Sequence, residues 1–213
     1  VSDSLLKAID TLIVVIMPVM VMCLICGDYI VTILFGRGNF GQAAVIATAG
    51  VVTGYALGFI FQAFRATCVR VYFAFKDSKT PMLNGLISVS ANILLSLTLS
   101  RFMGVKGIAV ATSIAMLLSS VLLLQGIDRY LPDFTLKPLS LDCIKVVFIT
   151  LIVAVSSFYL KQWLPFGTYI SFVIMGFYVV IVYYLLTLMT RVKPTVELTN
   201  VVYRTLKARY INH

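Results

Sequence analysis

The amino-acid sequence predicts an all-α membrane protein, a polytopic bundle of about six transmembrane helices with no separate soluble domain. Hydrophobic residues make up 61% of the 213 residues and charged residues 12%. The mean hydropathy of +1.03 is well above that of soluble domains. The apolar residues form continuous runs, which excludes a transmembrane barrel because barrel strands alternate lipid-facing and lumen-facing residues.

The six apolar runs cover residues 11–35, 43–64, 82–103, 105–127, 141–160 and 168–190. Each is close to the roughly 20 residues with which a helix crosses the hydrocarbon core. Turn-forming residues separate the runs, as in the stretch 76–81. There Thr80 and Pro81 predict a helix start, with the Thr80 hydroxyl as cap and Pro81 at the first helical position. Pro18 lies inside the first run and predicts a kink.

Lysine and arginine are distributed unevenly between the two ends of the predicted helices. One end carries Lys7, Arg65, Arg70, Lys76, Lys79, Arg129, Lys137, Lys145, Arg191, Lys193, Arg204, Lys207 and Arg209. The other end carries Arg37, Arg101, Lys106 and Lys161. Because cytoplasmic loops are enriched in these residues, both ends of the sequence are expected in the cytoplasm. An even number of spans requires the same arrangement.

The chain divides into three parts: four transmembrane helices in residues 1–130, two further helices rich in aromatic residues in 131–192, and a basic cytoplasmic tail in 193–213. In the tail Leu198, Val202, Leu206 and Tyr210 recur at a spacing of four. This spacing favours a helix on the inner leaflet, and a frayed basic tail fits equally well. Charged residues before the first run argue against a cleaved signal peptide, and we expect a longer polypeptide.

The sequence contains no set of residues typical of a soluble enzyme. His213 is the only histidine, which excludes a His cluster and a Ser/His/Asp triad. Cys23 and Cys26 lie about one helical turn apart but lack partner ligands for a metal. We therefore expect no enzyme activity, metal site or cofactor, and no nucleic-acid partner.

Polar residues within or beside the apolar runs are candidates for function, because each costs free energy in hydrocarbon. Gln62, Arg65 and Arg70 continue the second run and could line a substrate cavity, where arginine clamps a phosphate bidentately. Alternatively, the two arginines only reach the lipid head groups. Asp28 either pairs with Arg37 or lies at the outer interface.

Asn92 is the centre of a polar stripe with Ser88 and Ser96, at a spacing of four. The stripe either lines an aqueous cavity or makes interhelical hydrogen bonds. A ridge of small residues in the second run predicts close helix packing: Gly50, Gly54 and Gly58.

Three stretches resemble sequence motifs of one family. The run RVYFAFKDSKTP, residues 70–81, is similar to the R-x-x-Y-A-x-x-D-T-x-T-P signature of the MurJ (MviN) lipid II flippases. Residues 35–40 resemble the F-x-R-G-x-F turn of that family, and Asn92–Leu95 followed by Gly104–Ser113 resembles its N-x-x-L and G-x-x-G-x-A-x-A-T-S stretches. The residues assigned to the motif loops are Arg37, Tyr72, Asp77, Thr80 and Pro81.

The resemblance implies a fold and a function. Family members have about fourteen spans and belong to the multidrug/oligosaccharidyl-lipid/polysaccharide exporter superfamily. The sequence then corresponds to the last six spans: residues 1–130 to most of the second transport lobe, and 131–192 to an extra pair beside a groove for the polyprenyl tail. The family's main head-group arginines would lie upstream of Val1.

The implied activity is translocation of the lipid-linked peptidoglycan precursor lipid II across the bacterial cytoplasmic membrane by alternating access. The implied partners are that precursor, membrane lipids and the N-terminal part of the same flippase. A coupling ion or the membrane potential could supply the energy.

Three other functions stay open. One is export of another lipid-linked polysaccharide or teichoic acid precursor. Another is a polytopic membrane enzyme acting on lipid phosphates, for which Asp77 is the best candidate acid. The third is a membrane scaffold without transport.

Overall fold

The structure is a computed structural model that describes residues 2–130, 137–197 and 199. All regular structure in this part of the chain is helical. Its helices are α1 (Ser2–Phe35), α2 (Gln42–Ala56), α3 (Phe59–Ala74), α4 (Lys79–Met103), α5 (Val105–Ile127), α6 (Lys137–Trp163) and α7 (Thr168–Met189). The predicted all-α class is confirmed.

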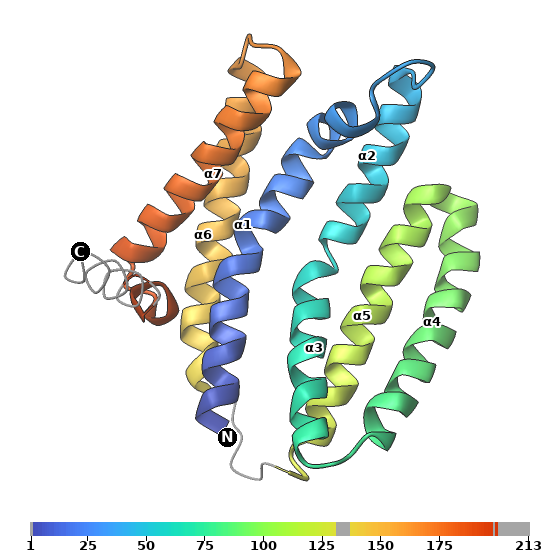
Figure 1. The fold of residues 1–213 in the computed structure, drawn as a ribbon, viewed down its shortest axis with the longest axis vertical. Helices are drawn as coiled ribbons and strands as arrows, with labels where there is room; N and C mark the ends of the chain where they lie inside the picture. Colours follow the sequence, from blue (N-terminus) through green and yellow to red (C-terminus); the bar gives the residue numbers. More distant parts are fainter. Residues whose placement is uncertain (1, 131–136, 198, 200–213) are drawn as a thin grey trace, which may run out of the picture.

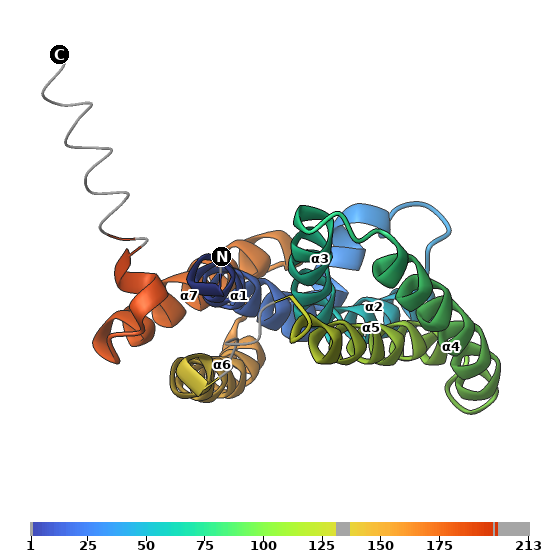
Figure 2. The same cartoon turned by 90° about the horizontal axis from the view of Figure 1, so that it is seen from below.

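The helices run side by side, with α1 between two groups (Figure 1). The pair α6 and α7 lies on one side of α1, and α2, α3 and α5 lie on the other. Seen along the bundle, α4 occupies the far edge and packs mainly against α5 (Figure 2). We call the end at which α1 begins the lower end, and the end at which α1 finishes the upper end, as drawn in Figure 1.

Six stretches of the described chain are long and apolar enough to cross a membrane. They are Leu5–Phe35, Gln42–Ala74, Lys79–Met103, Val105–Ile127, Asp142–Trp163 and Thr168–Met189. Each contains most of one predicted apolar run, so the prediction of six spans is confirmed. The second stretch is longer than predicted because the helix continues past Arg65 to the lower end.

The apolar run 43–64 predicted one continuous helix for the second span. This prediction is wrong. The span consists of α2 and α3, separated by a turn at Leu57 and Gly58. At this turn the Gly58 N–H donates to the Tyr55 carbonyl at 2.9 Å. A side chain at Gly58 would place its Cβ only 2.6 Å from the Ser113 Oγ of α5. The turn therefore lies where this span passes close to α5.

The glycine ridge packs against α5, as the sequence predicts. A Cβ on Gly54 would lie 2.8 Å from the Cβ of Ala109. The Ser113 hydroxyl donates to the Gly54 carbonyl at 2.7 Å. Such a hydrogen bond between helices requires a close approach of the two backbones, which small residues permit.

Helix α1 bends along its length (Figure 1). Its backbone leaves helical angles at Cys26, with φ −107° and ψ 18°, eight residues beyond the predicted kink site Pro18. Gly27 follows at once and lies against α2, where a Cβ would be 3.4 Å from the Ala49 carbonyl oxygen. The upper part of α1 thus approaches α2 closely.

A single buried cluster joins five helices through side chains that include Ile9, Val21, Tyr72, Leu123, Val153 and Val179. Many large apolar side chains are nevertheless exposed, including Phe102, Leu86, Leu94, Phe148 and Phe177. So large an apolar surface is unfavourable in water and favourable in lipid.

Two predictions concern boundaries and the tail. A boundary near residue 130 stays a prediction, because α1 packs against both the α6–α7 pair and the other helices.

Residues 193–197 form a short helical stretch after α7. The proposed amphipathic residues Leu198, Val202, Leu206 and Tyr210 lie outside the described residues.

Candidate functional site

A groove of about 660 Å³ lies at the lower end between α3 and α4. These two helices make little contact with each other, and both pack against α5. The groove is lined by Arg65, Ala66, Val69, Arg70, Phe73, Ser78, Lys79, Pro81 and Met82. Two of the predicted cavity residues, Arg65 and Arg70, therefore share one groove with a lysine.

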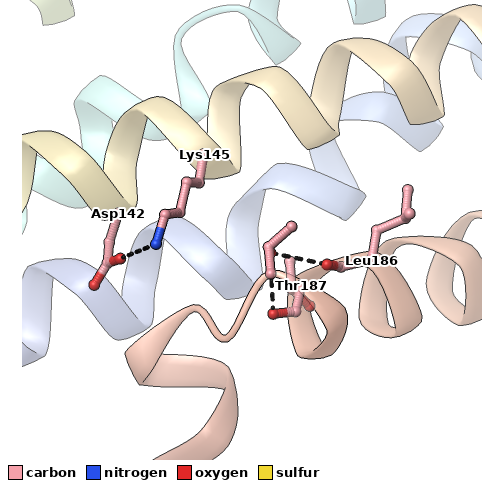
Figure 3. Close-up of polar contacts among 5 residues, drawn as sticks. Asp142, Lys145, Leu186 and Thr187 are labelled. Carbon is pink, nitrogen blue, oxygen red and sulfur yellow. Dashed lines mark hydrogen bonds and ion pairs between the residues drawn. The ribbon is translucent and has the colours of Figure 1, made fainter.

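The groove carries three cations that have no carboxylate partner among the described residues: Arg65, Arg70 and Lys79. The ion pairs of the described chain lie elsewhere: Lys7 with Glu197, Lys145 with Asp142, and Lys161 with Asp28. Figure 3 shows one of them, the pair on α6 with its Nζ and Oδ1 atoms 3.5 Å apart, near the end of α7. Uncompensated cations in a groove favour an anionic ligand.

Arg65 is held by a hydrogen-bond network at the base of the groove. Its Nε donates to the Ser119 Oγ of α5 at 2.9 Å. The Ser119 hydroxyl donates to the Asn84 Oδ1 of α4, and the Asn84 Nδ2 donates back to the Ser119 carbonyl at 3.2 Å. Ser119 and Asn84 are buried and Arg65 is half-buried. The network thus links α3, α4 and α5.

Most motif-loop residues form a junction beside the groove. Tyr72 is buried, and its hydroxyl donates to the Leu123 carbonyl of α5 at 2.7 Å. Its ring meets the Tyr130 ring edge-on, with centroids 5.6 Å apart. When the family signature is aligned on Arg70 and Asp77, its tyrosine position corresponds to Phe73 and not to Tyr72. Phe73 lines the groove.

Asp77 connects the start of α4 to the end of α5. Its Oδ1 accepts the N–H groups of Lys79 and Thr80 at 3.0 and 3.1 Å, and its Oδ2 accepts the Tyr130 hydroxyl at 2.8 Å. Hydrogen bonds from the side chain and backbone of Thr80, and from Tyr130, lower the pKa of Asp77 to about 2. The predicted start is corrected here: α4 begins at Lys79 with Ser78 at the N-cap position, and the Ser78 side chain makes no cap hydrogen bond. The side chain that accepts the first N–H groups is that of Asp77, one residue earlier, instead of Thr80. A carboxylate accepts the free N–H groups of a first turn well.

The other predicted residues lie outside the groove lining. Gln62 is exposed on α3, and Arg37 is exposed in the turn between α1 and α2 at the upper end. Asn92 accepts the hydroxyls of Ser96 at 3.2 Å and Thr112 at 3.3 Å. The structure thus joins Asn92 to α5, which is the interhelical alternative for the polar stripe.

Sequence reasoning missed Lys79, Asn84 and Ser119 as site residues. Asn84 lies four residues before Ser88 and extends the polar stripe by one turn, so the spacing of four could have identified it. Ser119 lies within an apolar run and gives no such signal. Its role depends on the contact of α5 with two other helices.

At the upper end, Asp28 pairs with Lys161 of α6, with Oδ1 and Nζ 2.6 Å apart. The alternative of a pair with Arg37 is therefore wrong. A cavity of about 520 Å³ beside this pair is lined by α1, α2 and α6. In the described part of the chain, no group of three or more His, Cys, Asp or Glu residues could hold a metal ion.

Comparisons with known proteins identify the family. The family model "Lipid II flippase MurJ" matches residues 1–178. A probable lipid II flippase MurJ of Thermotoga maritima is 33% identical over 125 residues, covering 59% of this chain and 26% of the relative. The corresponding protein of Synechocystis is 31% identical over 127 residues, covering 60% of this chain and 24% of the relative. The chain therefore spans about a quarter of the length of these curated relatives.

A solved structure shares the fold. The structure of "Lipid II flippase MurJ, inward closed conformation" matches with a TM-score of 0.72 and 24% identity, over 90% of this chain and 42% of that one. Together with the six apolar helices, the matches indicate a multi-pass protein of the bacterial inner membrane. The chain belongs to the MurJ lipid II flippase family.

Proposed function

We propose that this chain forms part of a flippase that moves lipid II, a lipid-linked pyrophosphate sugar, across the cytoplasmic membrane. The observation that carries the proposal is the groove between α3 and α4, with three cations that lack carboxylate partners in the described chain. Family membership supplies the substrate class. The rest of the length of the curated relatives would complete the transport path.

The charges of the groove suit a pyrophosphate. A pyrophosphate esterified at both ends keeps about two negative charges, and the planar guanidinium groups of Arg65 and Arg70 can each bind a pair of its oxygens. Lys79 adds a compact positive charge on the opposite helix. Because Arg65 is half-buried, its attraction for an anion is screened less than that of a fully exposed charge.

The proposal places the lower end in the cytoplasm. Basic residues cluster at that end, including Lys7, Lys76, Arg129 and Arg191, which supports this orientation through the positive-inside rule. The groove would then lie near the cytoplasmic face and could receive the head group before translocation.

The helix pair α6 and α7 would contact the isoprenoid tail. Exposed apolar and aromatic side chains cover its surface, among them Phe148, Phe158, Tyr159 and Phe177. Such a surface is compatible with lipid chains. Rocking of helical lobes around a fixed site would switch access, with an ion gradient or the membrane potential as energy source and no cofactor.

The geometry of Asp77 argues against its acting as the general acid of a lipid-phosphate enzyme. Both carboxylate oxygens accept hydrogen bonds from groups of the protein. A general acid needs a raised pKa, whereas the pKa of Asp77 is lowered to about 2. Asp77 is thus suited to a structural role, in which it joins the start of α4 to Tyr130.

Depletion of the native gene product tests the function. Cells that lose it should stop growing and accumulate lipid-linked peptidoglycan precursor on the cytoplasmic side. Normal growth and normal precursor export would contradict the proposal. Accumulation of a different lipid-linked precursor would instead indicate an exporter of another polysaccharide.

Complementation with variants tests the groove. The variants Arg65→Ala and Arg70→Ala should each reduce export roughly 10-fold or more, because each removes a charge-assisted contact worth about 1.5–3 kcal/mol. Arg101→Ala is the matched control, since Arg101 is an exposed arginine at the upper end of α4. Equal losses from all three variants at equal protein levels would contradict the role of the groove.

A further inference from the structure

The hydrogen bonds around Arg65 fix the role of every polar atom in the network. The single hydroxyl proton of Ser119 goes to the Asn84 Oδ1, so the Ser119 oxygen can only accept from the Arg65 Nε. The Asn84 amide cannot be flipped without loss, because its Nδ2 donates to the Ser119 carbonyl. The network therefore has one consistent arrangement of donors and acceptors.

This arrangement leaves one edge of the guanidinium for a ligand. With Nε bound at the base of the groove, the terminal amino groups Nη1 and Nη2 remain as a planar pair of donors. Arg65 itself lines the groove. A planar donor pair matches two oxygens of a phosphate group.

A glycine of α4 lies beside that edge. A Cβ on Gly85 of α4 would lie 3.9 Å from the Arg65 Nη2. A Cβ there would be in ordinary van der Waals contact with the guanidinium. Gly85 is thus a neighbour of the Nη2 side on α4.

We propose that Ser119 and Asn84 are positioning residues that hold Arg65 for bidentate binding of a pyrophosphate group in the groove. This inference rests on the proposed function and names residues that act through Arg65. Ser119 is fully buried and Asn84 is 5% exposed, so both act on the ligand through Arg65 and not by direct contact. Their contribution is to remove rotational freedom from a side chain that has several rotatable bonds.

Binding of inorganic pyrophosphate to the purified native gene product in lipid nanodiscs tests the proposal. Ser119→Ala should weaken binding about 10-fold, which corresponds to about 1.4 kcal/mol, and Ser119→Thr should restore it by returning the hydroxyl. Ser120→Ala is the matched control, because the Ser120 hydroxyl also joins α5 to α3 but donates to the Phe61 carbonyl at 2.8 Å. Ser120→Ala should bind pyrophosphate like the wild type.

A double variant separates positioning from general stability. Arg65→Lys keeps the charge and lacks the planar donor pair, so it should bind pyrophosphate about 10-fold more weakly, and Ser119→Ala should have no further effect in that background. Wild-type affinity in Arg65→Lys, or equal losses in Ser119→Ala and Ser120→Ala, would overturn the proposal. Ser119-dependent binding in a protein that exports no precursor would uphold this inference and contradict the proposed function.

Discussion

The Lys161 ammonium on α6 donates to the Asp28 carboxylate on α1 over 2.6 Å, although the two residues are 133 positions apart. The same ammonium donates to the Ile25 carbonyl at 2.7 Å and lies 4.6 Å from the centre of the Tyr29 ring. Ile25 immediately precedes Cys26, where the backbone of α1 leaves helical angles. Lys161 therefore binds the bent part of α1 through three groups and joins it to the C-terminal helix pair.

Removal of Lys161 should destabilise the protein. Lys161→Met should lower the free energy of unfolding in detergent by about 1–2 kcal/mol, a value reduced from that of a buried pair because Asp28 is partly exposed. The exchanged pair Asp28→Lys with Lys161→Asp should not restore stability, because a carboxylate at position 161 cannot donate to the Ile25 carbonyl. Full recovery by the exchanged pair would show that only the charge pair matters.

Gly126 should be intolerant of a side chain as long as Tyr72 keeps its hydroxyl. A Cβ at Gly126 would lie 2.5 Å from the Tyr72 hydroxyl oxygen and 3.6 Å from its Cζ. Gly126→Ala should therefore cost about 1–3 kcal/mol, and Tyr72→Phe about 1 kcal/mol for the lost hydrogen bond.

Unfolding of both single variants and the double variant provides the test. In the Tyr72→Phe background Gly126→Ala should cost clearly less, because the clashing atom is gone. Additive losses would show that the two residues do not compete for the same space.

Asp77 should make stability depend on acid pH. Its pKa is about 2 in the folded protein and about 3.9 in an unfolded chain. The stabilisation by the carboxylate is therefore complete above about pH 4 and is lost as the pH falls toward 2. Unfolding midpoints measured between pH 5 and pH 2 should fall less steeply for Asp77→Asn than for the wild type.

Tyr130→Phe removes one of the hydrogen bonds to Asp77 and serves as the intermediate case. Its pH dependence should lie between those of the wild type and Asp77→Asn. Identical slopes for all three proteins would show that Asp77 does not titrate in this window.

Lys76 should be replaceable by glycine with a gain in stability. Lys76 lies two residues past the end of α3 and has a φ of 61°, a region that L residues rarely adopt. The Asp77 N–H donates to the Tyr72 carbonyl at 3.0 Å and the Lys76 N–H to the Phe73 carbonyl at 3.0 Å, the pattern of a helix end that favours glycine. Lys76→Gly should raise the free energy of unfolding by about 0.5–1 kcal/mol.

Lys76→Ala is the control, since it removes the charge but keeps the Cβ. It should give no gain in thermal unfolding. An equal gain from alanine would attribute the effect to charge. Arg191, with a φ of 50° at the end of α7, should respond to glycine in the same way.

The sequence predicted the features that depend on local composition. The six spans follow from continuous apolar runs, because only a helix satisfies its backbone within one segment in lipid. The close approach at Gly54 follows from small residues repeated along one helix face. The family follows from motifs that the matched model supports over residues 1–178.

The position of a polar residue along its own helix does not reveal which side chain on another helix it bonds to. Asn92 could equally have faced a cavity, and only the contact of α4 with α5 brings the Thr112 hydroxyl within 3.3 Å of it. At the break, Gly58 likewise lies close to Ser113 and Met116 of α5, a contact that an apolar run does not reveal.

Hydropathy and motif spacing alone thus determined the class, the number of spans and the family of this protein. The tertiary structure decided that Arg65, Arg70 and Lys79 share one groove, that Ser119 and Asn84 hold Arg65, and that Lys161 pairs with Asp28. The physical reason is that burial in lipid is a property of each segment. A hydrogen bond or ion pair between segments instead depends on which helix faces pack together.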